Sequence, residues 1–99
     1  MIYQISLLQK AEDELSDAVN WYEEEREFLG TEFLHEVNKY LVIISQKPEY
    51  FKVVHKNYRQ VKIRRFPYVI VYRIIKKQVV VYSVFHCSRN PKSKLKRSR

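Results

Sequence analysis

Several residue types that build functional sites are scarce in this chain of 99 residues. Cys87 is its single cysteine and Gly30 its single glycine, which excludes an intramolecular disulfide and the glycine-rich loops that hold phosphate groups. The three histidines, His35, His55 and His86, lack the spacing of metal ligands, and no second cysteine could join them. The sequence therefore predicts no metal and no cofactor.

Long apolar runs are missing as well. No stretch approaches the roughly 20 apolar residues that cross a bilayer, and the N-terminus lacks the basic and apolar segments of a secretory signal. We therefore expect a cytoplasmic protein with no membrane partner.

The length and the hydrophobic content of 45% fit a single domain, predicted over residues 1–91. Residues 92–99 are too polar for a core and predict a mobile basic tail.

Acidic residues are absent from the entire second half. Residues 1–49 hold 4 basic and 11 acidic residues, a net charge of −7, whereas residues 50–99 hold 15 basic and no acidic residues, a net charge of +15. Solubility alone does not require such a separation. The basic half therefore favours a polyanionic partner, either RNA or DNA, or an acidic protein.

The first half has the pattern of a short strand followed by a helix. Residues 2–5 predict the strand, and Ser6 with Gln9 has the spacing of a capping box at a helix start. An apolar stripe at helical spacing then predicts a helix that runs to about Arg26.

A second helix is predicted after a turn at Gly30, where a left-handed or capping residue is needed. Its apolar stripe is wider than that of the first helix, so it should be the more buried. The helix should end near Gln46, because Pro48 disfavours helical geometry at the residue before it. The two helices would form a hairpin.

The second half has the pattern of a strand meander. Residues 59–65, 68–75 and 79–86 are rich in β-branched and aromatic residues, and residues 51–54 predict a further short strand. The middle run, 68–75, has apolar residues on both faces and should be central. The order predicts an α+β fold, with an N-terminal strand and helical hairpin packed on one face of a small, mainly antiparallel sheet. One sheet face should be apolar and the other basic.

Candidate functional residues concentrate in these strands. They are basic or aromatic side chains that could hold phosphates and stack bases: Lys62, Arg64, Arg65, Arg73, His86 and Arg89, with Tyr58, Tyr72 and Tyr82 nearby. The same set could cleave RNA if histidine or lysine moved protons and arginine stabilised the phosphorane. A purely structural role remains the alternative. Tyrosines on a sheet usually contribute to packing, and His86 could form a hydrogen bond at the end of a strand.

Cys87 next to His86 suggests a thiol nucleophile beside its base. Adjacent strand residues point to opposite faces, so the two side chains could meet only where the strand has ended. We therefore expect Cys87 to be a small buried residue.

Five segments together resemble toxins of the RelE/ParE superfamily from bacterial type II toxin-antitoxin systems. They cover nearly the whole chain: AEDEL at 11–15, NWYEE at 20–24, FLGTEFL at 28–34, RRFPYVIVY at 64–72 and VFHCSRNP at 84–91. The resemblance implies the α+β fold described above, a toxin that arrests growth, and a cognate antitoxin that binds it in a hetero-oligomer.

The superfamily contains ribosome-dependent mRNA endonucleases and, on the same fold, inhibitors of DNA gyrase that need no catalytic residue. Of the nuclease residues, one strand lysine is matched by Lys62, but Gln60 stands at the other lysine position. Val69 stands where the nucleases have an arginine, and Arg89 matches a final arginine. The resemblance therefore implies only half of the nuclease set.

The VFHCSRNP ending is closer to the ParE-like branch, so a non-enzymatic toxin with gyrase as the leading target is favoured. A RelE-like ribosome-dependent mRNA endoribonuclease is the alternative. It would draw its catalytic residues from Lys62, Arg64, Arg73, His86 and Arg89, with His86 or Arg73 replacing the missing arginine. A housekeeping RNA-binding protein, which would have the same charge separation, is the third candidate.

Overall fold

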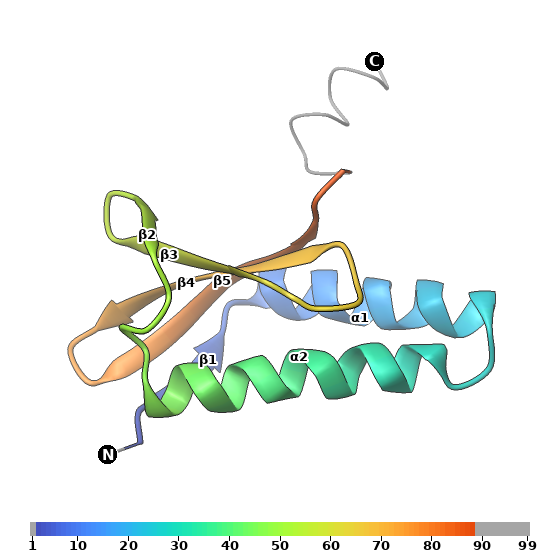
Figure 1. The fold of residues 1–99 in the computed structure, drawn as a ribbon, viewed down its shortest axis with the longest axis horizontal. Helices are drawn as coiled ribbons and strands as arrows, with labels where there is room; N and C mark the ends of the chain where they lie inside the picture. The colour runs from blue at the N-terminus through green and yellow to red at the C-terminus, as the bar shows by residue number, and fades with distance from the viewer. Residues whose placement is uncertain (1, 89–99) are drawn as a thin grey trace.

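The computed structural model describes residues 2–88, so Arg89 and the predicted tail at 92–99 lie outside the described residues. The described range folds into two helices and five strands: β1 (Gln4–Leu7), α1 (Gln9–Glu25), α2 (Leu29–Gln46), β2 (Val53–His55), β3 (Tyr58–Lys62), β4 (Tyr68–Ile75) and β5 (Gln78–His86). Figure 1 shows α1 and α2 side by side as an antiparallel hairpin that packs against the sheet. In this part of the chain, neither helix is long and apolar enough to cross a membrane.

The sheet has the strand order β1-β5-β4-β3-β2. β1 pairs with β5 in parallel, and every other neighbouring pair is antiparallel. β4 therefore lies at the centre, as its apolar residues on both faces predict. The α+β fold class, with the helical hairpin on a mainly antiparallel sheet, is confirmed.

The core lies between the helical hairpin and one face of the sheet. α2 contributes Phe33, Val37 and Ile44, all fully buried, and the facing strands contribute residues such as Ile70 and Val81. Helical side chains at three- and four-residue spacing share one face, which is why the apolar stripe of α2 meets the sheet. The face of the sheet turned away from α1 and α2 is called the uncovered face below.

An aromatic cluster closes the core near the loop that joins β3 and β4. The rings of Tyr22 and Phe33, from the two helices, contact those of Phe66 and Tyr68 at centroid distances of 5.0 to 6.1 Å. Several pairs meet edge to face, the arrangement that aromatic quadrupoles favour. The loop of residues 63–67 is therefore packed through Phe66 between the hairpin and the sheet.

The start of the chain differs from the prediction. β1 spans Gln4–Leu7 instead of residues 2–5, and Ser6 lies inside the strand, so no capping box forms. The cap position of α1 is Leu8, which has extended backbone angles and no side-chain capping bond. Parallel pairing with β5 continues through Leu8, whose N–H donates to the Val81 carbonyl at 3.0 Å. Long-range strand pairing thus overrides a local capping signal.

The role predicted for Gly30 is also wrong. Gly30 lies in the first turn of α2, and the left-handed residue at the junction is Phe28, with φ of 71°. A Cβ on Gly30 would lie 2.5 Å from the carbonyl oxygen of Val19 on α1. Glycine is needed here because the two helices approach closely, and not because the backbone turns.

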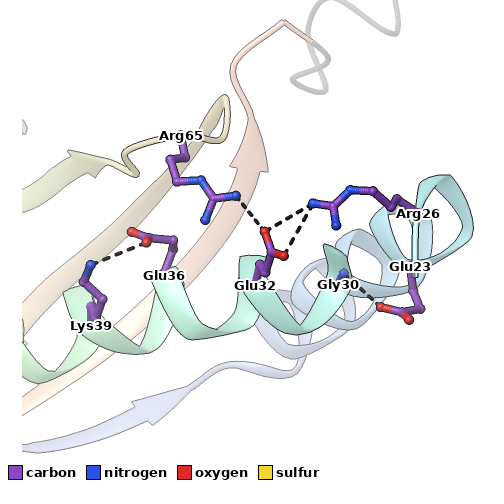
Figure 2. A network of polar contacts seen from close by, with 7 residues as sticks. All are labelled: Glu23, Arg26, Gly30, Glu32, Glu36, Lys39 and Arg65. Carbon is purple, nitrogen blue, oxygen red and sulfur yellow. Dashed lines mark hydrogen bonds and ion pairs between the residues drawn. The ribbon is translucent and has the colours of Figure 1, made fainter. Parts of the chain in front are cut away.

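Glu23 of α1 caps the N-terminus of α2 across the hairpin. Its carboxylate accepts a hydrogen bond from the backbone N–H of Phe28 at 2.8 Å. It also accepts one from the backbone N–H of Gly30 at 2.9 Å (Figure 2). A helix start leaves several N–H groups without intrahelical partners and favours negative charge. The carboxylate supplies both acceptor and charge.

Two further strand boundaries differ from the prediction by two residues or more. β2 begins at Val53 instead of residue 51, and β3 ends at Lys62 instead of residue 65. Arg65 has φ of 77°, which breaks the strand geometry, while the N–H of Ile63 donates to the Tyr68 carbonyl at 2.9 Å. Arg64 and Arg65 consequently belong to the loop of residues 63–67 and not to a strand.

Candidate functional site

The strand register separates two of the predicted catalytic residues. Lys62 lies opposite Val69 of β4, whereas His86 lies opposite Tyr68. Successive strand residues point to opposite faces, and Tyr68 packs against Phe33 on the helical side. Lys62 is therefore exposed on the uncovered face, and His86 lies on the other face.

Arg73 shares the uncovered face with Lys62 but lies at the other end of it. The four-residue offset from Val69 to Arg73 corresponds to roughly 13 Å along the strand. The guanidinium carbon of Arg73 lies 5.3 Å from the ring centroid of Tyr58. The Tyr58 ring meets that of Tyr82 at 5.1 Å with an interplanar angle of 85°. Lys62, Arg73 and His86 therefore do not converge on one site.

Tyr72 is not part of the basic surface that the sequence suggested. Its side chain is fully buried, and its hydroxyl donates to the Pro48 carbonyl at 2.6 Å. Burial raises the pKa of Tyr72 to about 12, because the anionic form would lose its hydration. Tyr72 is a core residue that ties the segment after α2 to the sheet.

Arg59 on β3 pairs with Tyr72 on β4 and has a structural role that sequence reasoning missed. Its guanidinium donates to the carbonyl oxygens of Glu49 at 3.2 Å and Phe51 at 2.6 Å. Arg59 and Tyr72 together hold the connection between α2 and β2. Both hydrogen bonds from Arg59 are accepted by backbone carbonyl oxygens. Every residue has such an oxygen, so the sequence does not reveal which one is the partner.

His86 has a geometry that disfavours a role as general base. Its Nδ1 accepts a hydrogen bond from the backbone N–H of Ser88 at 3.0 Å, and its ring lies edge-on to Tyr68 at 5.1 Å. A neutral imidazole that accepts at Nδ1 carries its proton on Nε2. In this arrangement Nε2 can donate a proton but has no lone pair to accept one.

Cys87 follows the last residue of β5. It is half-buried, more accessible than predicted, and its backbone N–H donates to the Pro67 carbonyl at 2.7 Å. This bond ties the end of β5 to the loop of residues 63–67.

The loop that carries Arg64 and Arg65 is anchored to α2 by Glu32 (Figure 2). One oxygen of Glu32 accepts from Arg65 at 2.7 Å, and the carboxylate also accepts from Arg26 at 3.3 and 3.4 Å. The hydrogen bond from Arg65, followed by that from Arg26, holds the pKa of Glu32 below its ordinary value of 4.5. Arg65 is therefore an anchoring residue, also placed 5.0 Å from the Phe66 ring.

Arg64 is held differently. Its backbone N–H donates to the Tyr40 hydroxyl at 3.3 Å, while its side chain is exposed. Of the five residues predicted to carry chemistry, Arg64 and Lys62 are thus exposed, Arg73 and His86 are half-buried, and Arg89 lies outside the described residues.

Glu14 is another residue that sequence reasoning missed. Its Oε1 accepts from the Ser83 hydroxyl at 2.8 Å and from the Val84 N–H at 2.9 Å, beyond the point where β1 stops pairing with β5. The carboxylate thereby satisfies an edge N–H that would otherwise lack a partner. The 70-residue separation hides this pairing from any local pattern.

Neither a metal site nor a hollow coincides with these residues. Within residues 2–88, no group of three or more histidine, cysteine, aspartate or glutamate side chains could hold a metal ion. An open hollow of about 420 Å³ lies at the end of α2, and none of the predicted site residues lines it: its walls are Tyr3, Gln46, Lys47, Pro48, Glu49 and Tyr50.

Several solved structures have the same fold. The chromosomal ParDE toxin-antitoxin system from P. aeruginosa matches with a TM-score of 0.71 and 12% identity, over 86% of this chain and 96% of that chain. The isolated E. coli RelE toxin matches with a TM-score of 0.67 and 24% identity, over 98% of this chain and 99% of that chain. An E. coli RelE mutant with two arginines changed to alanine, in complex with an antitoxin RelBc peptide, also matches. Its TM-score is 0.71 and its identity 20%, over 100% of this chain and 96% of that chain.

Identities this low establish the fold alone. None of the curated protein sequences compared with this chain matches it significantly. The family model described as "ParE toxin of type II toxin-antitoxin system, parDE" matches residues 5–91. Because this match extends over most of the chain, the protein belongs to the family of ParE toxins of type II toxin-antitoxin systems.

Proposed function

We propose that this toxin arrests bacterial growth by binding an essential target without cleaving a bond, with DNA gyrase as the leading candidate. The observation that carries the proposal is the match of the ParE toxin model over residues 5–91. A fold alone cannot choose between targets, so the arrangement of individual residues has to support the choice.

The positions of the candidate catalytic residues support a binding mechanism. Lys62 and His86 are on opposite faces of the sheet. Arg73 lies roughly 13 Å along β4 from Val69, the residue that pairs with Lys62. Val69, only 6% exposed, occupies the position where the resemblance to nucleases would require an arginine. A valine cannot stabilise the charge that develops on phosphate during RNA cleavage.

The target is tested by running two assays on one antitoxin-free preparation. We expect gyrase to lose supercoiling activity on relaxed plasmid in proportion to added toxin, while mRNA on programmed ribosomes stays intact. Arg89→Ala should weaken the inhibition of gyrase. Cleavage of mRNA in the ribosomal A site, lost in His86→Ala or Arg89→Ala, would instead establish the endonuclease and overturn the proposal.

Growth arrest is tested in cells. Induced expression of the chain should stop growth, and coexpression of the cognate antitoxin should restore it. Normal growth at a confirmed high level of soluble toxin would contradict the proposal. The antitoxin gene is expected beside that of the toxin, encoding a small protein with an acidic segment.

The antitoxin is proposed to contact two different surfaces. The helical hairpin exposes apolar side chains that an amphipathic segment could cover, including Trp21 (45% exposed), Val42 (54%) and Ile43 (37%). Residues 50–88 contain basic side chains and no carboxylate, which suits acidic contacts. Apolar contacts would supply affinity, and the charges would speed association and select the partner.

A further inference from the structure

A cluster of one arginine and two tyrosines lies on the uncovered face of the sheet, away from Lys62. It consists of Tyr58 on β3, Arg73 on β4 and Tyr82 on β5, and is called the tyrosine–arginine cluster below. Tyr82 is the extra residue at a bulge, because Val71 pairs with Ser83 and Tyr72 with Val81. Bulges redirect side chains, and here the Tyr82 ring lies against Tyr58.

Arg73 has unusual surroundings for a half-buried cation. Its Nε atom is buried and makes no hydrogen bond, and within residues 2–88 no carboxylate pairs with its guanidinium. The contact that holds it is with the Tyr58 ring, at 5.3 Å. Buried cations are normally paired, because burial removes their hydration. Without an acidic partner, the guanidinium is available to a negatively charged ligand.

Further cations surround the cluster. Lys56 is in the turn between β2 and β3, and Lys76 and Lys77 are in the turn between β4 and β5; all three are exposed. Figure 1 shows both turns at the same end of the sheet, opposite the end that carries the loop of residues 63–67. Residues 50–88 contain no aspartate or glutamate, so the strands and turns at this end contribute only positive charge.

We propose that the tyrosine–arginine cluster is the centre of a binding surface for single-stranded nucleic acid. Bases stack on aromatic rings and on guanidinium planes, and phosphates bind lysine and arginine. Lys56, Lys76 and Lys77 would contact the flanking phosphates. An acidic peptide would use the positive charge but would leave the half-exposed tyrosine rings without a matching group. The proposal goes beyond growth arrest through gyrase, because it assigns the toxin its own contact with nucleic acid.

Binding is measured by fluorescence anisotropy with fluorescein-labelled 12-nucleotide oligothymidylate and oligouridylate, and the purified antitoxin-free chain. Arg73→Gln and Tyr82→Leu should each weaken binding by about tenfold or more, the effect of losing one stacked base. Arg73→Lys keeps the charge but loses the planar group, and should weaken binding to a similar extent. The two oligomers distinguish DNA from RNA as the preferred strand.

Lysine variants separate phosphate contacts from stacking. Lys76→Gln should reduce the slope of log affinity against log salt by about 0.7, the value for one phosphate on a single strand. Tyr82→Leu should leave that slope unchanged. The matched control is Lys39→Gln, which removes one positive charge from α2, and should leave the affinity within about twofold.

Three results would overturn the proposal. Equal weakening by Lys39→Gln and Arg73→Gln would indicate only a general effect of charge. Displacement of the labelled strand by oligoglutamate as efficiently as by unlabelled oligothymidylate would indicate a site for an acidic protein segment. Equal affinity for a duplex of the same length would exclude contacts with unpaired bases.

A measurement on the unmodified protein guards against variants that fail to fold. A 12-nucleotide strand with 5-iodouracil is photocrosslinked to the toxin, and the modified peptide is identified by mass spectrometry. Crosslinks at Tyr58 or Tyr82 are expected. Crosslinks confined to Tyr50, which is 72% exposed at the end of the hollow near α2, would contradict the assignment.

Discussion

Single side chains decide how the loop of residues 63–67 is placed, and Glu32 is the clearest case. Its carboxylate accepts hydrogen bonds from arginines on two separate segments, Arg26 after α1 and Arg65 in the loop. A glutamate with two cationic partners favours its ionised form, so the pKa is lowered. The bond between Arg65 and Glu32 is a long-range contact that both positions the loop and depends on pH.

Replacing Glu32 should therefore change the pH dependence of stability. A carboxyl whose pKa is depressed in the folded state stabilises the fold above its unfolded pKa, near 4.5, and loses that contribution as pH falls through the folded value. We expect Glu32→Gln to lower Tm at pH 6 to 7, and the two proteins to converge at acidic pH.

Thermal melting followed by circular dichroism across pH checks this expectation. High salt should shrink the difference at neutral pH, because the partners are partly exposed. A constant difference at every pH would show that the packing of Glu32, and not its charge, matters. Lys39→Gln, which removes a weaker neighbouring pair with Glu36 at 3.4 Å, is the comparison.

Tyr72 gives a second prediction at this scale. Tyr72→Phe removes the hydroxyl that donates to the Pro48 carbonyl and leaves that acceptor unpaired next to the core. The expected loss is about 1–3 kcal/mol in the free energy of unfolding, measured by urea denaturation. Tyr82→Phe, at a half-exposed tyrosine, is the control and should change stability by less than about 0.5 kcal/mol.

The same residue predicts behaviour at alkaline pH. The pKa of Tyr72 rises from 10.0 to about 12 on folding, so the fold favours the protonated hydroxyl. This contribution is complete below pH 10 and is lost as pH rises through 12. Unmodified toxin should lose stability across that window more steeply than Tyr72→Phe. Equal slopes would show that other groups dominate.

At the scale of elements, the close approach of α1 and α2 depends on Gly30. Alanine is normally preferred over glycine inside a helix by about 1 kcal/mol. At position 30, however, the added methyl group would lie 2.5 Å from the Val19 carbonyl, a backbone atom that cannot move alone. The helices would have to separate, and the capping hydrogen bonds that Glu23 accepts would lengthen.

We therefore expect Gly30→Ala to reduce the free energy of unfolding by about 1–3 kcal/mol, the range for overpacked sites. Chemical denaturation provides the measurement. Asn38→Ala, at an exposed position of the same helix, should be neutral or slightly stabilising. A stabilised Gly30→Ala variant would show that the hairpin can open at this point without loss of packing.

At the scale of the whole molecule, the separation of charge predicts how the antitoxin binds. The acidic residues lie on and next to the helical hairpin, and the carboxylate-free range 50–88 forms most of the sheet. Association of an acidic antitoxin segment should slow as salt rises from about 0.05 to 0.5 M, because screening shortens the range of attraction. Stopped-flow mixing measures this rate.

Dissociation should respond less to salt, because apolar contacts on the hairpin are not screened. An association rate that does not depend on salt would remove the electrostatic part of the proposal and leave only the apolar contact. Such a result would also weaken the inference of nucleic-acid binding, which rests on the same positive field.

The sequence by itself determined the order of the elements, the helical hairpin and the central position of β4. Each of these follows from local periodicity: 3.6-residue spacing in α1 and α2, and residues apolar on both faces over 68–75. It also determined the charge separation and, through motifs spread along the chain, the toxin family. These properties depend on composition and neighbouring residues, so no tertiary contact is needed to see them.

Only the tertiary structure decided which side chains share a surface. Ser6 joined a strand because β5 supplied its partner, and Gly30 was needed because α1 passes close by. Register placed Lys62 and His86 on opposite faces, since a shift of one residue reverses the direction of a side chain. Contacts between residues many positions apart have no local signature, and only the folded chain brings their partners together.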